Sequence, residues 1–389
     1  MDQVKENQLF ERIKQDKVLV VLIILCLVSL LRSLIVPLHG DELTYIKIGE
    51  HILNGKYYLQ DYPSTVTPVL PFMVAFFHTS FYPAIGFVFM KCFNLVLAFF
   101  GMRYMCLFLK EQGLGIPVIL SIFILTLTNA HSIAWFSSLY PESVLFFSFW
   151  GFVYYYSKSI TVSNFRKMFF FFLLLCMTRY LYAVLGLVVL AYYYRCFKLD
   201  VLNRHEIRNV FFYSFIFVMP VLLWFKYVYL IEQNNLSEIS YFDRFKEDSG
   251  LMTNILSGLG LEKHPEVTRI NGVPAFISLF VPVTGLREFV SSIILIGLFL
   301  YGYIKTDKPK GIQLVFYATI LVMLGLVFAG TGFSRYWLVL LPCFYLGYYY
   351  VYKSFKFDDA WFLKLAKIIA IVYVINDLRL DFVIMGKYL

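Results

Sequence analysis

The chain has 389 residues, of which 60% are hydrophobic and only 15% are charged. Its 42 Phe and 30 Tyr residues raise the apolar content above what the core of a soluble domain can bury. This composition excludes a soluble globular protein and predicts an all-α polytopic membrane protein. The formal net charge of +9 is compatible with a nucleic-acid partner only until the positions of the basic residues are considered.

Eleven apolar runs are candidates for membrane-spanning helices, each of which needs roughly 20 residues. The runs cover residues 18–38, 83–109, 116–136, 141–157, 167–178, 180–197, 209–231, 289–304, 312–330, 335–352 and 361–378. The block from 167 to 197 is too long for one straight helix and short for two. We count it as two helices because the charges of the loops then alternate, which predicts about 11 transmembrane helices.

The distribution of basic residues sets the expected orientation. When the N-terminus is placed in the cytoplasm, more than half of the 34 Lys and Arg residues fall in short cytoplasmic loops and tails. The basic excess then reflects membrane topology, and nucleic acid is not expected as a partner. Two long segments, residues 39–82 and 232–288, are left on the outer face, where we expect the functional site.

An acidic pair, Asp41 and Glu42, follows the first apolar run directly. A carboxylate at the hydrocarbon boundary loses hydration unless it meets a partner, so the pair is a candidate functional site. His39 lies beside the pair and could complete a site for a divalent metal ion, which is the one cofactor that the residues leave open. A histidine that is simply hydrogen-bonded at the boundary is the alternative.

Two amphipathic or apolar segments are predicted in the rest of the first outer loop. Polar residues recur at positions 47, 50, 51 and 54, while apolar residues cover the opposite side and Gly55 follows where a helix would stop. This pattern predicts an amphipathic helix along the membrane surface. After several prolines, a short apolar stretch ends at His78 and is too short to cross the membrane.

The order of these features resembles the GT-C superfamily, the polytopic glycosyltransferases that use lipid-phosphate sugars, including the protein O-mannosyltransferase and aminoarabinose-transferase relatives. The resemblance rests on five short segments in a fixed order. They are DELTY at 41–45, NGKYY at 54–58, YPE at 140–142, MTRY at 177–180, and RYW through LP at 335–342. The family implies a transmembrane catalytic domain over residues 1–352, with the two outer loops, and a C-terminal transmembrane helix and short tail over residues 353–389.

The resemblance implies inverting transfer of a sugar from a polyprenyl-phosphate carrier to a glycan, lipid or protein acceptor outside the membrane. Such transfer needs a carboxylate to take the proton of the acceptor hydroxyl. We expect Asp41 to be this base, with capping of the surface helix as the alternative. Glu42 could pair with a base, bind a cation or point away. Glu142 matches the second acidic position of the family, although it is also a favourable first-turn residue.

Cationic side chains are expected to stabilise the phosphate that leaves with the lipid. Arg335 and Arg179 lie at the outer ends of apolar runs and match family segments, so both are predicted to bind the donor phosphate. Arg179 could instead meet Glu142, and either arginine could extend to lipid headgroups. Lys91 lies deeper in its run and should face protein or a cavity, and it is the third candidate for the phosphate.

Four further residues are candidates for metal or acceptor contacts: His39, His264, Tyr57 and Tyr58. By analogy with compact members of the family, we expect a bacterial inner membrane with the site facing the exterior. Two other functions stay open. An O-antigen or polysaccharide polymerase or ligase would change the length of sugar chains, and a flippase or transporter of lipid-linked sugars would show charged residues throughout its spans and repeat symmetry.

Overall fold

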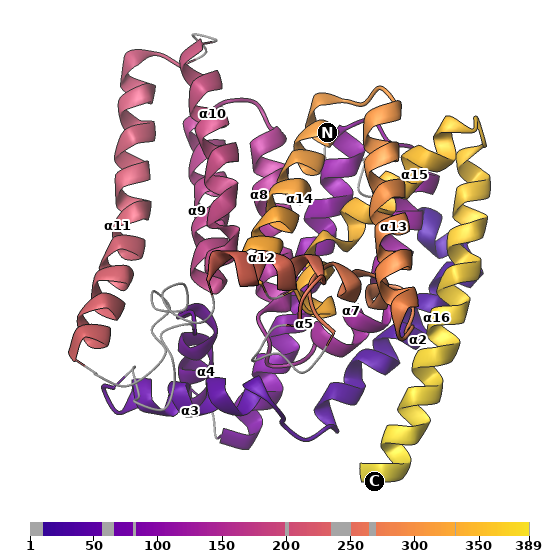
Figure 1. Cartoon of the computed structure of the whole chain (residues 1–389), viewed down its shortest axis with the longest axis horizontal. Helices are drawn as coiled ribbons and strands as arrows, with labels where there is room; N and C mark the ends of the chain where they lie inside the picture. Colours follow the sequence, from indigo (N-terminus) through magenta and orange to yellow (C-terminus); the bar gives the residue numbers. More distant parts are fainter. Residues whose placement is uncertain are drawn as a thin grey trace.

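The computed structural model describes residues 11–56, 66–80, 83–198, 202–234, 250–263, 270–330 and 332–388. This part of the chain is helical and contains no strand (Figure 1). The α-helices are α2 (Lys17–Leu31), α3 (Asp41–Leu53), α4 (Val69–Ser80), α5 (Pro83–Glu111), α6 (Ile116–Leu127), α7 (Ala130–Trp135), α8 (Glu142–Ser157), α9 (Val162–Thr178), α10 (Gly186–Lys198), α11 (Arg204–Asn234), α12 (Leu251–Leu259), α13 (Leu286–Lys305), α14 (Lys310–Phe328), α15 (Leu341–Ser354) and α16 (Asp359–Tyr388). The 3₁₀ helices are η1 (Arg32–Leu34), η2 (Tyr180–Leu185), η4 (Val273–Leu279) and η5 (Ser334–Leu340).

Every one of the eleven predicted apolar runs contains a helix, but within the described residues six helical segments are both long and apolar enough to cross a membrane. These six segments are Lys17–Leu34, Ile85–Glu111, Tyr180–Phe197, Arg204–Leu230, Leu286–Lys305 and Lys310–Phe328. They are compatible with an integral membrane protein. The other five runs stay predictions as membrane spans, because their helices are shorter or, in α16, carry several charged residues.

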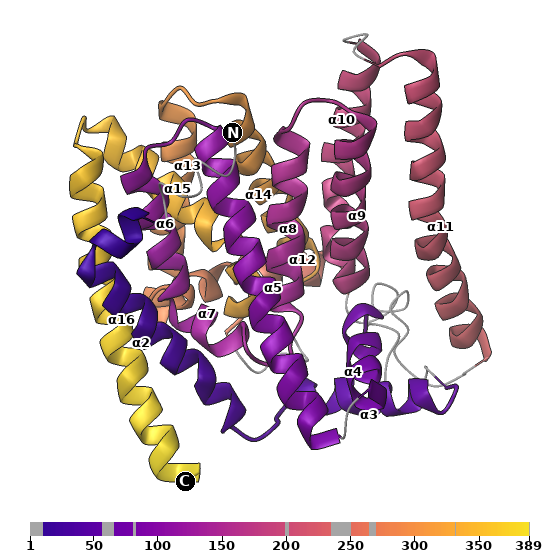
Figure 2. The ribbon, with the colours of Figure 1, turned by 180° about the vertical axis from the view of Figure 1, so that it is seen from behind.

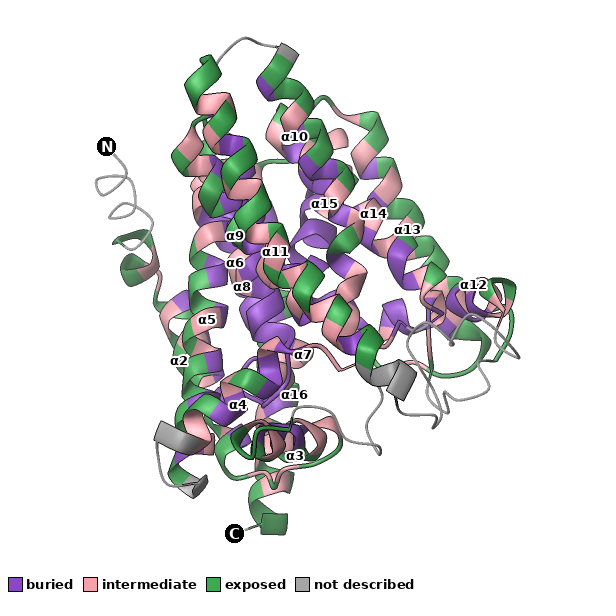
Figure 3. Ribbon diagram, turned by 90° about the vertical axis from the view of Figure 1, so that its left-hand side faces the viewer, coloured by how far each residue is buried: buried purple, intermediate pink, exposed green. Residues whose placement is uncertain are grey.

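Helix α8 lies at the centre of the bundle and packs against α5 and α9. Thirteen of its sixteen residues are buried, including Phe149, Trp150 and Phe152. A helix that is apolar on all sides is stable only where neighbours cover every face. Figure 3 shows the buried residues gathered along this axis, whereas α11 and α13 are largely exposed. The first residue of α8 is Glu142, so the core itself fixes the position of that carboxylate.

The predicted helix in the first outer loop is confirmed as α3, which lies crosswise to the long helices (Figure 1). It begins after Gly40 and ends before Gly55, and both glycines have positive φ, at 57° and 74°. The apolar stretch that follows forms α4, which packs on α3 and α5. The position of α3 relative to a membrane surface stays a prediction.

The long apolar block divides at Arg179, as predicted, because this residue adopts an extended conformation with φ −153° and ψ 121°. Helix α9 therefore ends at Thr178, and η2 and α10 continue in a new segment.

At the other side of the bundle, α2 and α16 run side by side (Figure 2). Three predicted contact residues, Tyr57, Tyr58 and His264, lie outside the described residues.

Candidate functional site

Four charged side chains from distant parts of the chain meet at one end of α8. The Nη2 atom of Arg335 donates to Asp41 Oδ2 at 2.6 Å, and its Nε lies 3.8 Å from Glu142 Oε1. Arg179 Nη2 donates to the same Glu142 oxygen at 2.9 Å. Glu142 is thus shared by two guanidiniums, and Asp41 contacts only one of them. We call these four residues the charge network.

The charge network is exposed at one end and buried at the other. The Asp41 side chain is 50% exposed, whereas those of Arg335 and Glu142 are 13% and 1% exposed. Burying ion pairs is costly unless they are also held by further contacts. Solvent or a substrate can therefore reach the network through Asp41, while Glu142 is closed off.

Aromatic rings form the wall around the two guanidiniums. The Cζ atom of Arg179 lies 3.7 Å from the centroid of the Tyr336 ring, and that of Arg335 lies 4.8 Å from the Tyr140 ring and 5.6 Å from the Trp135 ring. Such cation–π contacts hold the guanidinium planes without occupying their N–H groups. The N–H groups of both arginines therefore still point outward in the guanidinium planes, where they meet Asp41 and Glu142.

Tyr45 lies close enough to the charge network to interact electrostatically with all four of its members. Burial raises the pKa of Tyr45 well above its ordinary value, although the nearby Arg179 acts in the opposite direction. The pKa of Tyr140 is also raised, first by burial and then by the charge of Asp41. Both hydroxyls therefore stay protonated at neutral pH, and that of Tyr140 donates to the carbonyl oxygen of His39 at 3.3 Å.

Two buried polar atoms of the network have no hydrogen-bond partner among the described residues. They are Arg335 Nε, a donor, and Glu142 Oε2, an acceptor. Buried polar atoms in folded proteins almost always find a partner, so an unpaired donor beside an unpaired acceptor indicates a place where a ligand or water binds. The two atoms are therefore compatible with a bound ligand or water in the network, although nine other buried side-chain atoms of the described residues are unpaired too.

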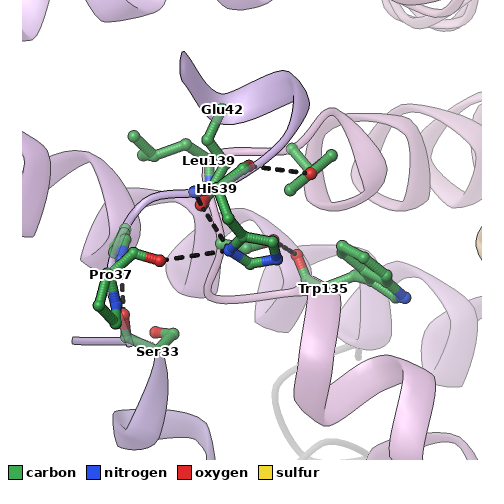
Figure 4. Close-up of polar contacts among 9 residues, drawn as sticks. Ser33, Pro37, His39, Glu42, Trp135 and Leu139 are labelled. Carbon is green, nitrogen blue, oxygen red and sulfur yellow. Dashed lines mark hydrogen bonds and ion pairs between the residues drawn. The ribbon is translucent and has the colours of Figure 1, made fainter. Parts of the chain in front are cut away.

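Glu42, although adjacent to Asp41, points away from the network. It is buried, and it accepts hydrogen bonds from the backbone N–H of Leu139 at 2.8 Å and from that of His39 at 3.0 Å. The Nδ1 atom of His39 lies 3.3 Å from Glu42 Oε2 and 3.2 Å from the carbonyl oxygen of Pro37 (Figure 4). Through these hydrogen bonds Glu42 holds the start of α3 against the segment before α8.

We expect Glu42→Gln to lower the stability of the protein by about 1–3 kcal/mol, because an amide replaces one of the two buried acceptor oxygens by a donor group. The measurement is thermal or denaturant unfolding in detergent. The matched control is Glu50→Gln, which makes the same change on an exposed position of α3. Equal stability of the two variants would show that the contacts of Glu42 do not fasten α3.

Lys91 is buried in α5 and donates to the carbonyl oxygen of Ser33. Its electrostatic partner is Glu42 and not a member of the charge network. The structure therefore brings Arg335 and Arg179 together at Glu142, but it does not bring Lys91 to them, and phosphate binding by the two arginines stays a prediction. A phosphate contact of Lys91 stays a prediction without support from the geometry.

Of the three residues predicted for a metal site, His39 and Glu42 lie together, but Asp41 does not join them. Asp41 turns to Arg335, while Glu42 turns to the backbone of Leu139. In the part of the chain that the structure describes, no group of three or more His, Cys, Asp or Glu side chains is placed to hold a metal ion. A divalent ion stays an untested prediction, and no role in the site depends on it.

An apolar cavity of about 680 Å³ lies between α4, α9 and α11, and its lining includes Met177, two residues before Arg179. Thr67 Oγ1 donates to the carbonyl oxygen of Thr178 at 2.6 Å. This bond links the segment before α4 to the last residue of α9, which directly precedes Arg179. We call this cavity the apolar groove. It is lined by Pro68, Val69, Phe72, Phe170, Leu173, Leu174, Met177, Pro220, Leu223, Trp224 and Tyr227.

No known protein-family model, curated protein or solved structure matches the chain. The site is therefore interpreted from its own geometry, and membership of the GT-C superfamily stays a hypothesis. The aromatic wall around the two guanidiniums was not predicted from the sequence. A signal was present, because Tyr140 and Tyr336 of this wall, and also the nearby Tyr45, each fall within a segment that carries a member of the charge network. The contact of Thr67 with α9 had no signal in the sequence.

Proposed function

We propose that the protein transfers a sugar, with inversion, from a polyprenyl-phosphate carrier to a hydroxyl acceptor on the outer side of a membrane. The observation that carries this proposal is the charge network. A half-exposed carboxylate is paired with a guanidinium, and a second guanidinium lies behind a shared glutamate. An apolar groove reaches Met177, two residues before Arg179 in the chain. An anionic lipid that carries a sugar has the three chemical parts that this arrangement suits.

Arg335 and Arg179 are proposed to bind the phosphate of the donor. A guanidinium presents several N–H groups in one plane and binds phosphate oxygens in pairs. Arg335 Nε is buried without a hydrogen-bond partner among the described residues, so a phosphate oxygen there would satisfy it. The two positive charges would also stabilise the negative charge that develops on the phosphate as it leaves.

Asp41 is proposed as the general base. In the absence of donor its carboxylate is held by Arg335, and a phosphate that takes over the N–H groups of Arg335 would release it. The acceptor oxygen then attacks the anomeric carbon and loses its proton to Asp41, while the bond between that carbon and the phosphate oxygen breaks. The carrier leaves as polyprenyl phosphate, and a single displacement inverts the anomeric centre.

Glu142 is proposed to position the two guanidiniums and not to exchange protons with substrate. Its side chain is 1% exposed, and one oxygen already serves both arginines. Without this shared carboxylate, two like charges would repel each other at the end of α8. Among the three acidic candidates, Asp41 alone is thus accessible and also in contact with the proposed phosphate site.

The apolar groove is proposed to hold the isoprenoid chain of the carrier. Its walls are apolar side chains of three helices, and Met177 lies two residues before Arg179. The phosphate is bonded directly to the isoprenoid chain. A chain that lies between α9 and α11 and ends at Met177 would therefore place its phosphate near Arg179. Burial of apolar chain would supply binding free energy that free sugar phosphates lack.

The test of this function uses purified protein in liposomes with an isotope-labelled polyprenyl-phosphate sugar and fractionated envelope glycans, lipids and proteins as acceptors. We expect one labelled sugar per acceptor and release of polyprenyl phosphate. Labelled chains of increasing length would instead indicate a polymerase or ligase. Movement of the labelled donor across the bilayer without any transfer would indicate a flippase or transporter.

Arg335→Gln is expected to weaken donor binding by about 10- to 100-fold, because hydrogen bonds to a charged group are lost at a buried position. The apparent affinity for acceptor should change much less. Both are measured as the concentration dependence of the initial transfer rate. The control is Arg287→Gln, which removes an exposed arginine on α13. An unchanged donor affinity in Arg335→Gln would refute the phosphate role of Arg335.

A further inference from the structure

A second cavity, of about 820 Å³, lies between α10 and α14 at the end of the bundle away from the charge network. Helix α8 separates the two, because Glu142 begins it and Tyr156 and Ser157, at its end, line this cavity. Sixteen residues of α-helix rise about 24 Å, so the second cavity is not part of the proposed transfer site.

The cavity has the shape of a wedge. At its narrow end the two segments touch, since a Cβ on Gly325 of α14 would lie 2.7 Å from Leu181 Cδ1 of η2. Toward the other end, α10 and α14 diverge and both line the space. The side chain of Gln112 closes one side, because a Cβ on Gly311 would lie 2.3 Å from its Oε1 atom. We call this space the wedge.

The walls of the wedge are apolar and its mouth is basic. Helix α10 contributes Leu187, Val188 and Ala191, and helix α14 contributes Leu314, Tyr317, Ile320 and Leu321. On each helix these residues recur at three- or four-residue spacing, so they form one continuous face. Arg195 and Lys310 are exposed and stand at the open end, where both helices reach their charged termini.

Acidic residues do not offset this charge within the wedge. Its lining among the described residues contains Arg195 and Lys310 but neither Asp nor Glu. Of the acids near the mouth among the described residues, Glu111 forms an ion pair with Lys158, and Asp307 lies beside Lys308 and interacts with its charge. The mouth therefore has a net positive charge next to an apolar interior.

We propose that the wedge binds an anionic phospholipid of the surrounding bilayer, with its phosphate between Arg195 and Lys310 and its acyl chains between α10 and α14. A free phosphate ion would use the basic mouth but would leave the apolar walls unfilled. A neutral lipid would fill the walls but would leave the two cations without a counter-charge. An anionic phospholipid satisfies both, and the exposed Leu187 and Tyr317 leave the wedge open toward the side.

The location supports the same choice. The six long apolar helices indicate a bilayer around the bundle, and the wedge opens at the end where the loops are rich in Lys and Arg. Basic residues near the bilayer surface are attracted to anionic headgroups. Lipid binding in the wedge does not depend on whether the protein transfers sugars.

The test is native mass spectrometry of the full-length protein released from detergent with phosphatidylglycerol or phosphatidylcholine. We expect wild type to retain phosphatidylglycerol preferentially. The Arg195→Gln/Lys310→Gln variant should bind it about 10- to 30-fold more weakly, since each basic residue near the surface contributes to the attraction. The control Arg208→Gln/Lys364→Gln removes the same charge from exposed positions that do not line the wedge, and it should bind as wild type does.

A second variant, Leu314→Trp, fills the apolar part without changing charge. We expect it to reduce retention of phosphatidylglycerol as well, with thermal unfolding confirming that each variant is folded. Equal loss in the control pair, or full retention in both wedge variants, would refute the site. Displacement by millimolar inorganic phosphate, or a stronger preference for polyprenyl phosphate than for phosphatidylglycerol, would overturn the assignment to a phospholipid.

Discussion

Asp41→Asn is expected to lower the rate of sugar transfer by about 100- to 10,000-fold, which is the range that a positioned general base supplies. An amide oxygen can still accept the hydrogen bond from Arg335, so the geometry of the network should survive the change. The amide cannot take the proton of the acceptor hydroxyl. The measurement is the initial transfer rate in proteoliposomes at saturating donor, because saturation separates the chemical step from binding.

The control for this experiment is Glu50→Gln, the same kind of change on an exposed residue of α3 that lies outside the network. It should leave the rate unchanged. Donor affinity and thermal stability of Asp41→Asn should also stay near those of wild type. If Asp41→Asn transferred sugar at the rate of wild type, Asp41 could not be the base, whatever the role of the arginines.

Glu142→Leu is expected to destabilise the protein by about 3–5 kcal/mol, because removal of one partner from a buried ion pair leaves the other charges uncompensated. Arg179 loses its ion pair with Glu142, whereas Arg335 keeps its ion pair with Asp41. The measurement is denaturant unfolding in detergent, supported by the fraction of protein that elutes as a monodisperse peak.

A double variant separates this electrostatic loss from poor packing of leucine. Glu142→Leu/Arg179→Met removes both charges, and we expect it to recover a large part of the stability lost in Glu142→Leu. Arg179→Met alone should again be destabilised, since the buried Glu142 then has only the longer contact with Arg335. Additive losses in the double variant would mean that the two residues do not stabilise each other.

The helices were largely predictable because their signals are local. The spacing of polar residues before Gly55 gave α3, and the length of the block from 167 to 197 indicated a break that the structure places at Arg179. Boundary charges in apolar segments also indicated that Arg179 would seek an anion, and Glu142 is its partner. The amphipathic pattern, the length of the apolar block and the need of a buried arginine for an anion can each be recognised from a few neighbouring residues.

The number of membrane spans was less predictable. An apolar run of ordinary length is required both by a helix that crosses lipid and by one that is enclosed by other helices. Helix α8 illustrates this, since it is apolar on all sides and almost wholly buried by its neighbours. Hydropathy along the chain cannot separate these two environments, because the difference lies in the packing partners.

The different roles of Asp41 and Glu42 could not be predicted from the sequence. Consecutive residues of a helix point about 100° apart, so one of the two must turn away from any given partner. Which one does so is decided by Leu139 and Arg335, which are 97 and 294 residues distant in the chain. The same holds for Lys91, whose contact with Ser33 depends on how α5 packs against η1.

The most direct test of the central claim is to locate the donor by photocrosslinking. A polyprenyl-phosphate sugar with a diazirine in its isoprenoid chain is irradiated with the protein in liposomes, and labelled peptides are identified by mass spectrometry. We expect labels on α9 and α11 at the lining of the apolar groove, and a strong decrease in labelling in Arg335→Gln. Labels confined to other helices, or labelling that Arg335→Gln leaves unchanged, would contradict a donor site at the charge network.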